Sequence, residues 1–216
     1  MKKFLFLLAL TMLPTLAFAD EESRKQVIVA VYKLVYIVGF LIGLVLMISA
    51  GYKMKMAADT NGPQSNKAII YISILAGVLM MNSSATLSKY IVTMLGSGSG
   101  HCFILDSSQS VAENCWSADS SGLTGELKGR IEKLSSGGTA QKFMDNLNII
   151  VGIFQVIGFI YFLVGVYGLV QVANGSSRDG GYGKPIITMI AAALIVDIPH
   201  TAEMAITTLE SIGINF

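Results

Sequence analysis

The sequence is poor in charge and has no excess of basic residues. Only 13% of its 216 residues are charged, and the formal net charge is +1. Soluble domains carry roughly a quarter charged residues, so the composition argues against a soluble globular protein. It also provides no basic surface for phosphates, and we expect no direct nucleic-acid binding. The chain instead has 53% hydrophobic residues in long blocks, which predicts an integral membrane protein of the all-α class.

Motifs of common enzymes are also missing from the sequence. It has no G-x-S-x-G nucleophile elbow, no H-E-x-x-H pair and no glycine-rich phosphate loop. His101 stands beside Cys102 and near Cys115, but these three side chains would lack a fourth ligand for zinc. We therefore expect a non-enzymatic protein without a cofactor or a metal.

The first 19 residues have the pattern of a secretory signal peptide. A basic start, "MKK", precedes an apolar run, "FLFLLALTMLPTL", and the small-x-small site "AFA" ends at Ala19. An uncleaved membrane anchor is the alternative. Cleavage after Ala19 is favoured because the apolar run is short and Pro14 interrupts it. The mature chain would then begin on the outer side of a bacterial inner membrane.

Four apolar segments follow, and they form two predicted transmembrane hairpins over residues 20–95 and 149–216. The first segment, 27–56, and the third, 149–173, each supply the roughly 20 apolar residues that a membrane-spanning helix needs. The second, 68–81, and the fourth, 186–196, are apolar for only about half that length before polar residues intrude. We expect four transmembrane helices, with the polar parts of the second and fourth shielded by protein.

The short loops within the two hairpins each carry more basic than acidic residues, which predicts the orientation of the chain. Lys53, Lys55 and Lys67 flank the first loop, and Arg178 and Lys184 lie in the second. Positively charged loops stay in the cytoplasm, so both termini and the 96–148 loop are expected in the periplasm.

The predicted periplasmic loop, residues 96–148, contains both cysteines of the chain. An oxidising periplasm permits a disulfide between Cys102 and Cys115. Apolar residues recur at intervals of three or four over 123–134, which predicts a short amphipathic helix in the same loop.

The two hairpins resemble each other, which indicates an internal repeat. "VGFLIGL" from Val38 matches "IGFIYFL" from Ile157, and "KAIIYISILAG" from Lys67 matches "KPIITMIAAAL" from Lys184, at separations of 117–119 residues. Small residues in the long segments allow close helix packing, either inside one bundle or between subunits. The candidate packing positions are Gly39, Gly43, Gly158, Gly165 and Gly168.

Polar residues interrupt the second segment of each hairpin, at Asn82 in the first and in "IVDIPHTAEM" in the second. On one helix, Asp197, His200 and Glu203 would share a face, and Pro199 would kink it. Interrupted spans with ionisable groups are typical of ion or proton paths. The favoured interpretation is simpler: the span leaves the hydrocarbon near Asp197, and the rest is an interfacial or subunit-facing helix.

With the signal peptide, the four spans and the motif "GGYGKPIITMIAAALIVDIP", the chain resembles the IcmC/DotE (conjugal TraQ-like) inner-membrane proteins of type IVB secretion systems. Each half also resembles a conjugative pilin hairpin. The resemblance implies a structural subunit that assembles with other membrane subunits into an apparatus for the export of effector proteins or conjugative DNA. It implies no catalytic residues. Two alternatives remain: a small ion- or proton-conducting transporter that uses Asp197 and His200, and a signalling or quality-control membrane protein that works through its periplasmic loop.

Overall fold

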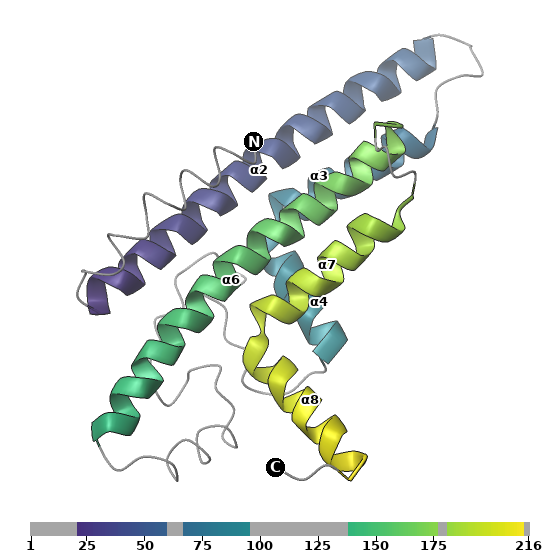
Figure 1. Ribbon diagram of the computed structural model, residues 1–216. Coiled ribbons are helices and arrows are strands. Elements are labelled where there is room, and N and C mark those ends of the chain that lie inside the picture. The colour runs from purple at the N-terminus through teal and green to yellow at the C-terminus, as the bar shows by residue number, and fades with distance from the viewer. Residues whose placement is uncertain (1–20, 60–66, 96–137, 177–180, 214–216) are drawn as a thin grey trace.

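The structure is a computed structural model that describes residues 21–59, 67–95, 138–176 and 181–213 (Figure 1). All regular structure in these ranges is helical, which confirms the all-α class. The helices are α2 (Glu21–Asp59), α3 (Lys67–Met81), α4 (Ser83–Leu95), α6 (Gly138–Ala173), α7 (Gly183–Val196) and α8 (Ile198–Ser211). The predicted signal peptide, the Cys102–Cys115 pair and the amphipathic helix at 123–134 lie outside the described residues.

Two helices, α2 and α6, are long and apolar enough to cross a membrane, and the number rises to four if each of two bent helix pairs is one span. Helix α2 has 39 residues, or about 58 Å, well beyond the roughly 30 Å of a hydrocarbon core. It begins before Val27, and α6 begins at Gly138 rather than at Ile149. The apolar blocks marked only the parts suited to lipid, and the helices continue through polar residues on either side.

The other two segments are each divided into two helices. The axes of α3 and α4 meet at 96° around Asn82, and those of α7 and α8 meet at 96° around Asp197. The bend at the second break is sharper than the proline kink that the sequence predicted there. Pro199 lies in the first turn of α8, where its missing N–H costs no helical hydrogen bond, and Asp197 is the non-helical residue.

The two hairpins repeat at a separation of 115 residues, not the 117–119 that sequence matching predicted. A Cβ atom built on Gly43 would lie 2.8 Å from the carbonyl oxygen of Gly77, and one on Gly158 would lie 2.9 Å from that of Ala192. Gly158 and Ala192 each lie 115 positions after their counterparts, as Asp197 does after Asn82. This register defines a first hairpin, α2 with α3 and α4, and a second hairpin, α6 with α7 and α8.

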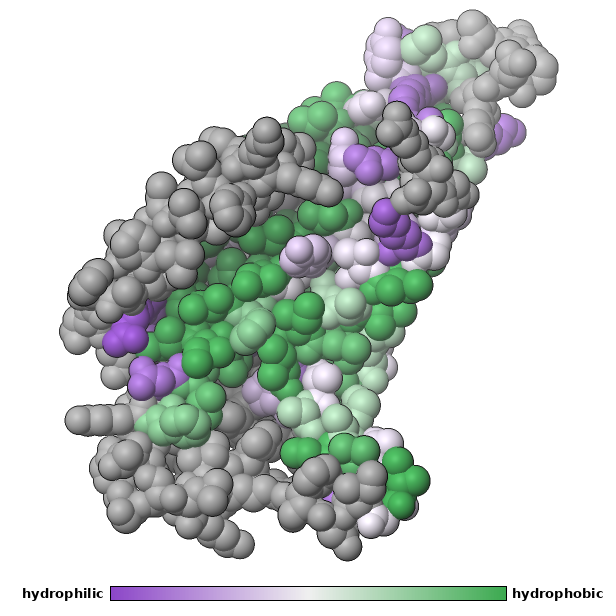
Figure 2. All heavy atoms as spheres, in the orientation of Figure 1, coloured by the Kyte–Doolittle hydropathy of each residue, from purple (hydrophilic) through white to green (hydrophobic). Residues whose placement is uncertain are grey.

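Both hairpins have the same orientation in the molecule. Helices α2 and α6 run in the same direction, and their C-terminal ends lie at the same end of the molecule as the first residues of α3 and α7 (Figure 1). The Lys53 ammonium, near the C-terminal end of α2, donates a hydrogen bond of 3.3 Å to the side-chain carbonyl of Asn174, directly after α6. Figure 2 shows an apolar surface over the middle of the molecule and hydrophilic residues towards the end with the turns.

Helix α6 is the central element, since it packs against α7 of its own hairpin and against both α2 and α3. Tyr32 of α2 stacks on Phe159 of α6 with ring centroids 4.5 Å apart. Both rings are buried, with 2% and 0% of their surface exposed. Burial of such aromatic pairs fixes how the first hairpin lies against the second.

Candidate functional site

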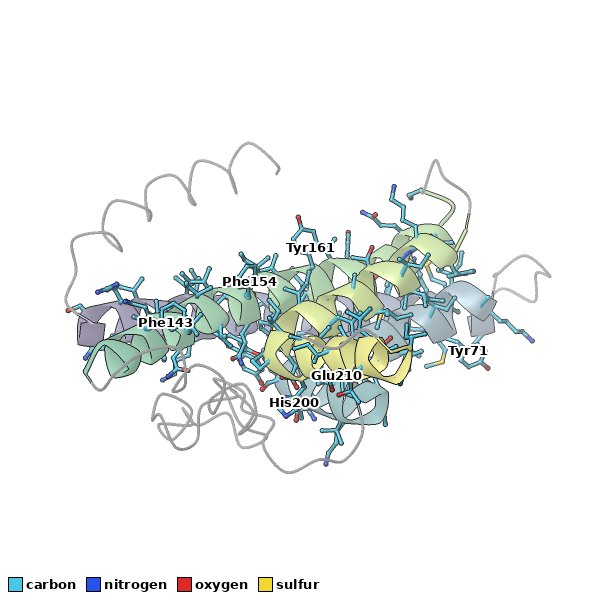
Figure 3. All side chains as sticks on the ribbon, turned by 60° about the horizontal axis from the view of Figure 1, so that its bottom comes forward. Tyr71, Phe143, Phe154, Tyr161, His200 and Glu210 are labelled. Atoms are coloured by element: carbon cyan, nitrogen blue, oxygen red, sulfur yellow. The ribbon has the colours of Figure 1, made fainter. Side chains whose placement is uncertain are left out.

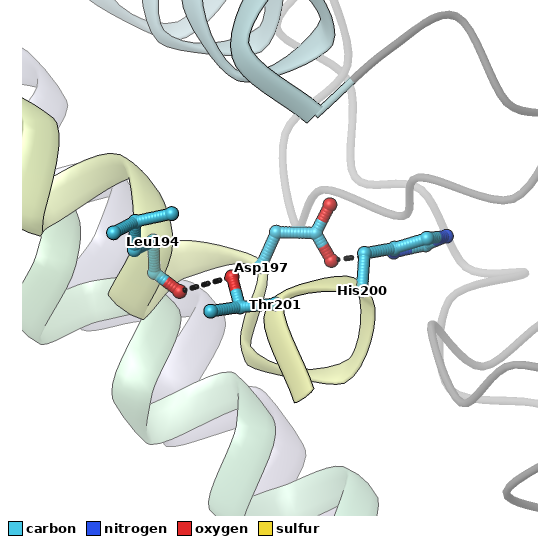
Figure 4. A network of polar contacts seen from close by, with 4 residues as sticks. All are labelled: Leu194, Asp197, His200 and Thr201. Atoms are coloured by element: carbon cyan, nitrogen blue, oxygen red, sulfur yellow. Dashed lines mark hydrogen bonds and ion pairs between the residues drawn. The ribbon is translucent and has the colours of Figure 1, made fainter. Parts of the chain in front are cut away.

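The break between α7 and α8 holds the ionisable residues that the sequence singled out. Asp197 has φ −116° and ψ 56°, outside the helical region, and is 5% exposed. Its carboxylate lies 2.7 Å from Nδ1 of His200 in the first turn of α8 (Figure 4). Asp197 and His200, which were expected to share the face of a continuous helix, are instead brought together by a break and the first turn of the next helix. The side chain of Glu203 is outside the described part of the structure.

Backbone groups released by the break find new partners. The Thr201 hydroxyl donates a hydrogen bond of 3.0 Å to the Leu194 carbonyl, which belongs to the last turn of α7. In Figure 4, Thr201 points back towards α7 while His200 points away from it. A carbonyl that is shielded from water and has no partner is costly, so the hydroxyl stabilises the sharp bend.

The first break uses the same backbone pattern with different side chains. The Thr86 N–H donates to the Asn82 carbonyl at 2.9 Å, and the Thr201 N–H donates to the Asp197 carbonyl at 3.0 Å. At the end of α3 the Tyr36 hydroxyl from α2 donates to the Met81 carbonyl at 3.4 Å. Asn82 itself is exposed, whereas Asp197 is buried, so the polar residues of the two breaks lie in different environments.

The breaks show no metal-binding arrangement in the described ranges. There, no three His, Cys, Asp or Glu side chains are grouped so that they could hold a metal ion. The chemistry on offer at the second break is that of one buried carboxylate in contact with one imidazole. Such a pair can exchange a proton or fix the geometry of a helix end.

The glycines predicted as packing positions lie against other helices of the same chain. A Cβ atom on Gly158 would be 2.5 Å from Val196, one on Gly165 would be 2.5 Å from Met189, and one on Gly168 would be 3.2 Å from Pro185, all on α7. These three glycines therefore pack within one bundle, which is one of the two predicted alternatives.

The Gly39–Gly43 pair in α2 serves two different neighbours. Gly43 approaches the backbone of α3, while a Cβ atom on Gly39 would lie 3.0 Å from the Leu163 side chain of α6. Gly43 therefore closes the first hairpin, and Gly39 admits a side chain of the second. A G-x-x-x-G spacing alone does not distinguish these roles, because both glycines lie on neighbouring parts of the helix surface.

Sequence analysis missed several buried polar residues. Asn148 and Gln155 of α6 are 5% and 7% exposed, and they lie seven residues apart on one face of the helix. Ser83, at the start of α4, is fully buried. Neither the Ser83 hydroxyl oxygen nor the Asn148 side-chain nitrogen has a hydrogen-bond partner among the described residues. For Gln155 the available signal was an amide inside the apolar segment 149–173, and Asn148 lies seven residues before it, just outside that segment.

Comparisons with protein-family models, with curated proteins and with solved structures gave no match. The function therefore has to be argued from the chain itself. Its distinctive features are a duplicated apolar hairpin, two equal helix breaks and a buried Asp197–His200 contact at one of them.

Proposed function

We propose that the protein is a non-enzymatic inner-membrane structural subunit of a type IV (type IVB-like) secretion or conjugation apparatus. The single observation that carries the proposal is the duplicated hairpin, with both turns at one end and both second helices bent by 96°. Such a body offers long helix sides to neighbouring membrane proteins. The resemblance to IcmC/DotE proteins and to conjugative pilin hairpins suggests that these neighbours are other membrane subunits of a secretion or conjugation apparatus.

The proposed orientation places the two turns in the cytoplasm and both termini in the periplasm. Lys53, Lys55, Lys67 and Lys184 all belong to the end of the molecule with the turns. Cationic residues are retained on the cytoplasmic side of the membrane, which supports this direction.

Helix lengths support a position of the breaks inside the outer half of the bilayer. Helix α3 has 15 residues, about 22 Å, so a helix that starts at the cytoplasmic surface ends about 8 Å short of the far surface. A bend of 96° then directs α4 and α8 along the membrane plane. In this position the two short helices are available to periplasmic or membrane-embedded partners of the apparatus.

Deletion of the gene in a bacterium that encodes it tests the proposed role. We expect loss of effector or DNA transfer, with growth and membrane integrity unchanged, and restoration by the wild-type gene. The matched control is a Gly51→Ala gene, because a Cβ atom at Gly51 would meet nothing within 4 Å. Undiminished transfer by the deletion strain would reject the secretion role.

Topology is tested separately with reporter fusions. Alkaline phosphatase, which is active only outside the cytoplasm, should be active when fused after Phe216 and inactive when fused after Asp59. The reverse pattern would reject the proposed orientation.

A second candidate function is an ion or proton path through the second break. The observation in its favour is the contact of 2.7 Å between a buried carboxylate and an imidazole at a broken helix. Ionisable groups are costly inside a membrane and are typical of ion and proton paths. Purified protein in vesicles with an internal pH-sensitive dye would report the flux. Flux that Asp197→Asn abolishes supports this function, and wild-type vesicles no leakier than empty ones exclude it.

A further inference from the structure

Equivalent positions of the two hairpins fall into three groups by burial. Some are buried in both hairpins, such as Gly43 and Gly158, and these form the contact inside each hairpin. Others are exposed in both, such as Ile42 and Ile157, each of which is 38% exposed. Apolar residues that both hairpins leave uncovered are suited to lipid.

The third group is buried on α6 and uncovered on α2. Phe159 and Leu163 of α6 are 0% and 8% exposed, whereas their counterparts Leu44 and Ile48 of α2 are 38% and 65% exposed. Val156 of α6 is also buried, and its counterpart Leu41 is 53% exposed. These α6 residues form the face with which the second hairpin covers the first, as the contacts of Phe159 and Leu163 show.

The surface of the first hairpin that receives this face is also duplicated. It contains Tyr32 and Gly39 of α2, which meet Phe159 and Leu163. On the second hairpin the counterparts of Tyr32 and Gly39 are Leu147 and Phe154 of α6. Leu147 is half-buried and Phe154 is 39% exposed.

On α3, too, a residue that is buried in the first hairpin has an exposed counterpart in the second. Ala76 of α3 is 1% exposed, but its counterpart on α7, Ala191, is exposed. Phe154 and Tyr161 project from the same side of α6 in Figure 3. The second hairpin thus carries an uncovered copy of the surface that the first hairpin uses inside the chain.

We propose that a second copy of this chain binds there, with its α2 face of Leu41, Leu44 and Ile48 against the α6–α7 surface around Leu147, Phe154 and Ala191. The contact continues the internal hairpin-to-hairpin interface from one copy to the next. Because the two surfaces differ, the interface is head-to-tail and generates a ring or a filament rather than a two-fold dimer. The inference goes beyond the secretion role and rests only on the membrane placement that the proposed function assumes.

The internal contacts predict which residues meet between copies. Phe154 of one copy, the counterpart of Gly39, should contact Ile48 of the next copy, the counterpart of Leu163. In the same way Leu147, the counterpart of Tyr32, should contact Leu44, the counterpart of Phe159. Phe154 is larger than Gly39, so the helices must lie farther apart at that point than they do inside the chain.

Neither predicted pair can meet within one chain. Gly39 and Leu163 lie at the same level of two helices that run in the same direction, with Ile48 nine residues after Gly39 and Phe154 nine residues before Leu163. At 1.5 Å per residue, Ile48 and Phe154 of one chain are about 27 Å apart along the helices. A cross-link between these positions must join two copies.

Cross-linking of two differently tagged copies tests the interface. Full-length Ile48→Cys chains with one tag and Phe154→Cys chains with the other are co-expressed in bacterial membranes and treated with a short bismaleimide. We expect a mixed-tag product several-fold above the background that wild-type chains give through Cys102 and Cys115. Ile42→Cys with Ile157→Cys is the matched control, on the same two helices but exposed in both hairpins, and it should stay at background.

The Leu44→Cys and Leu147→Cys pair repeats the test at the second contact, so that poor accumulation of one variant does not leave the question open. Products no more abundant than those of the control pair would overturn the inference, and so would a dominant Ile48–Ile48 product, which requires a two-fold dimer. Loss of cross-linking leaves the gene-deletion result unaffected, so failure of the interface and failure of the secretion role are distinguishable.

Discussion

Replacement of Gly43 by alanine measures how much the close approach of α2 and α3 contributes to the fold. The added Cβ atom would lie 2.8 Å from the Gly77 carbonyl oxygen and 2.9 Å from the Met81 backbone nitrogen. Both atoms belong to a helix backbone, so the helices must separate by about half an ångström. Overpacking of this kind costs about 1–3 kcal/mol, and alanine returns about 1 kcal/mol through its better helix propensity. We therefore expect a net loss of stability of up to about 2 kcal/mol.

Gly51→Ala is the matched control for this prediction, since it lies in the same helix and its Cβ atom meets nothing within 4 Å. It should keep or raise stability by up to about 1 kcal/mol. Thermal unfolding in mild detergent, followed by circular dichroism, should place Gly43→Ala up to about 6 °C below wild type, at about 3 °C per kcal/mol. Equal shifts for the two variants would refute the close-packing argument.

The remaining predictions concern the breaks and the contact between hairpins, and the same melts check the first two. Thr201→Val keeps the side-chain shape but leaves the Leu194 carbonyl unpaired, so it should cost about 1–2 kcal/mol, whereas Thr86→Val, whose hydroxyl has no hydrogen bond in the described structure, should be nearly neutral. Tyr32→Ala should cost about 3–5 kcal/mol because it removes a buried ring, and Tyr32→Phe, which keeps the stack on Phe159, should be close to wild type. Asp197→Asn should retain the helical circular dichroism of wild type, and a large loss of helix would contradict a break that does not need the charge.

The sequence predicts the parts of the fold that depend on hydrophobic pattern and helix breakers. The apolar blocks locate the lipid-suited parts of α2 and α6, and the polar residues at Asn82 and Asp197 mark both breaks. It cannot set the repeat register, because isoleucine and leucine match well at many shifts of an apolar segment. The register depends on backbone contacts at Gly43 and Gly158, which exist only after the helices have packed.

The candidate site was predicted in the same uneven way. The proximity of Asp197 and His200 follows from a spacing of three residues, which survives the change from a continuous helix to a break and a new first turn. The burial of Ser83 and Asn148 could not be predicted, because it depends on how the two hairpins and the short helices pack together. For the same reason, the sequence could not decide whether the glycines pack inside one bundle or between subunits.

Comparison of the two breaks separates the shape of the second from its chemistry. Both bends measure 96°, yet the first has neutral Asn82 where the second has Asp197, Ser84 where it has Pro199, and Ala85 where it has His200. A bend of this size therefore forms in this chain without a charge, a proline or an imidazole. A buried carboxylate in a membrane is costly, and the fold obtains the same geometry without one. The Asp197–His200 contact is thus an addition to the break, so substitutions that make the second break resemble the first test its function without removing the fold.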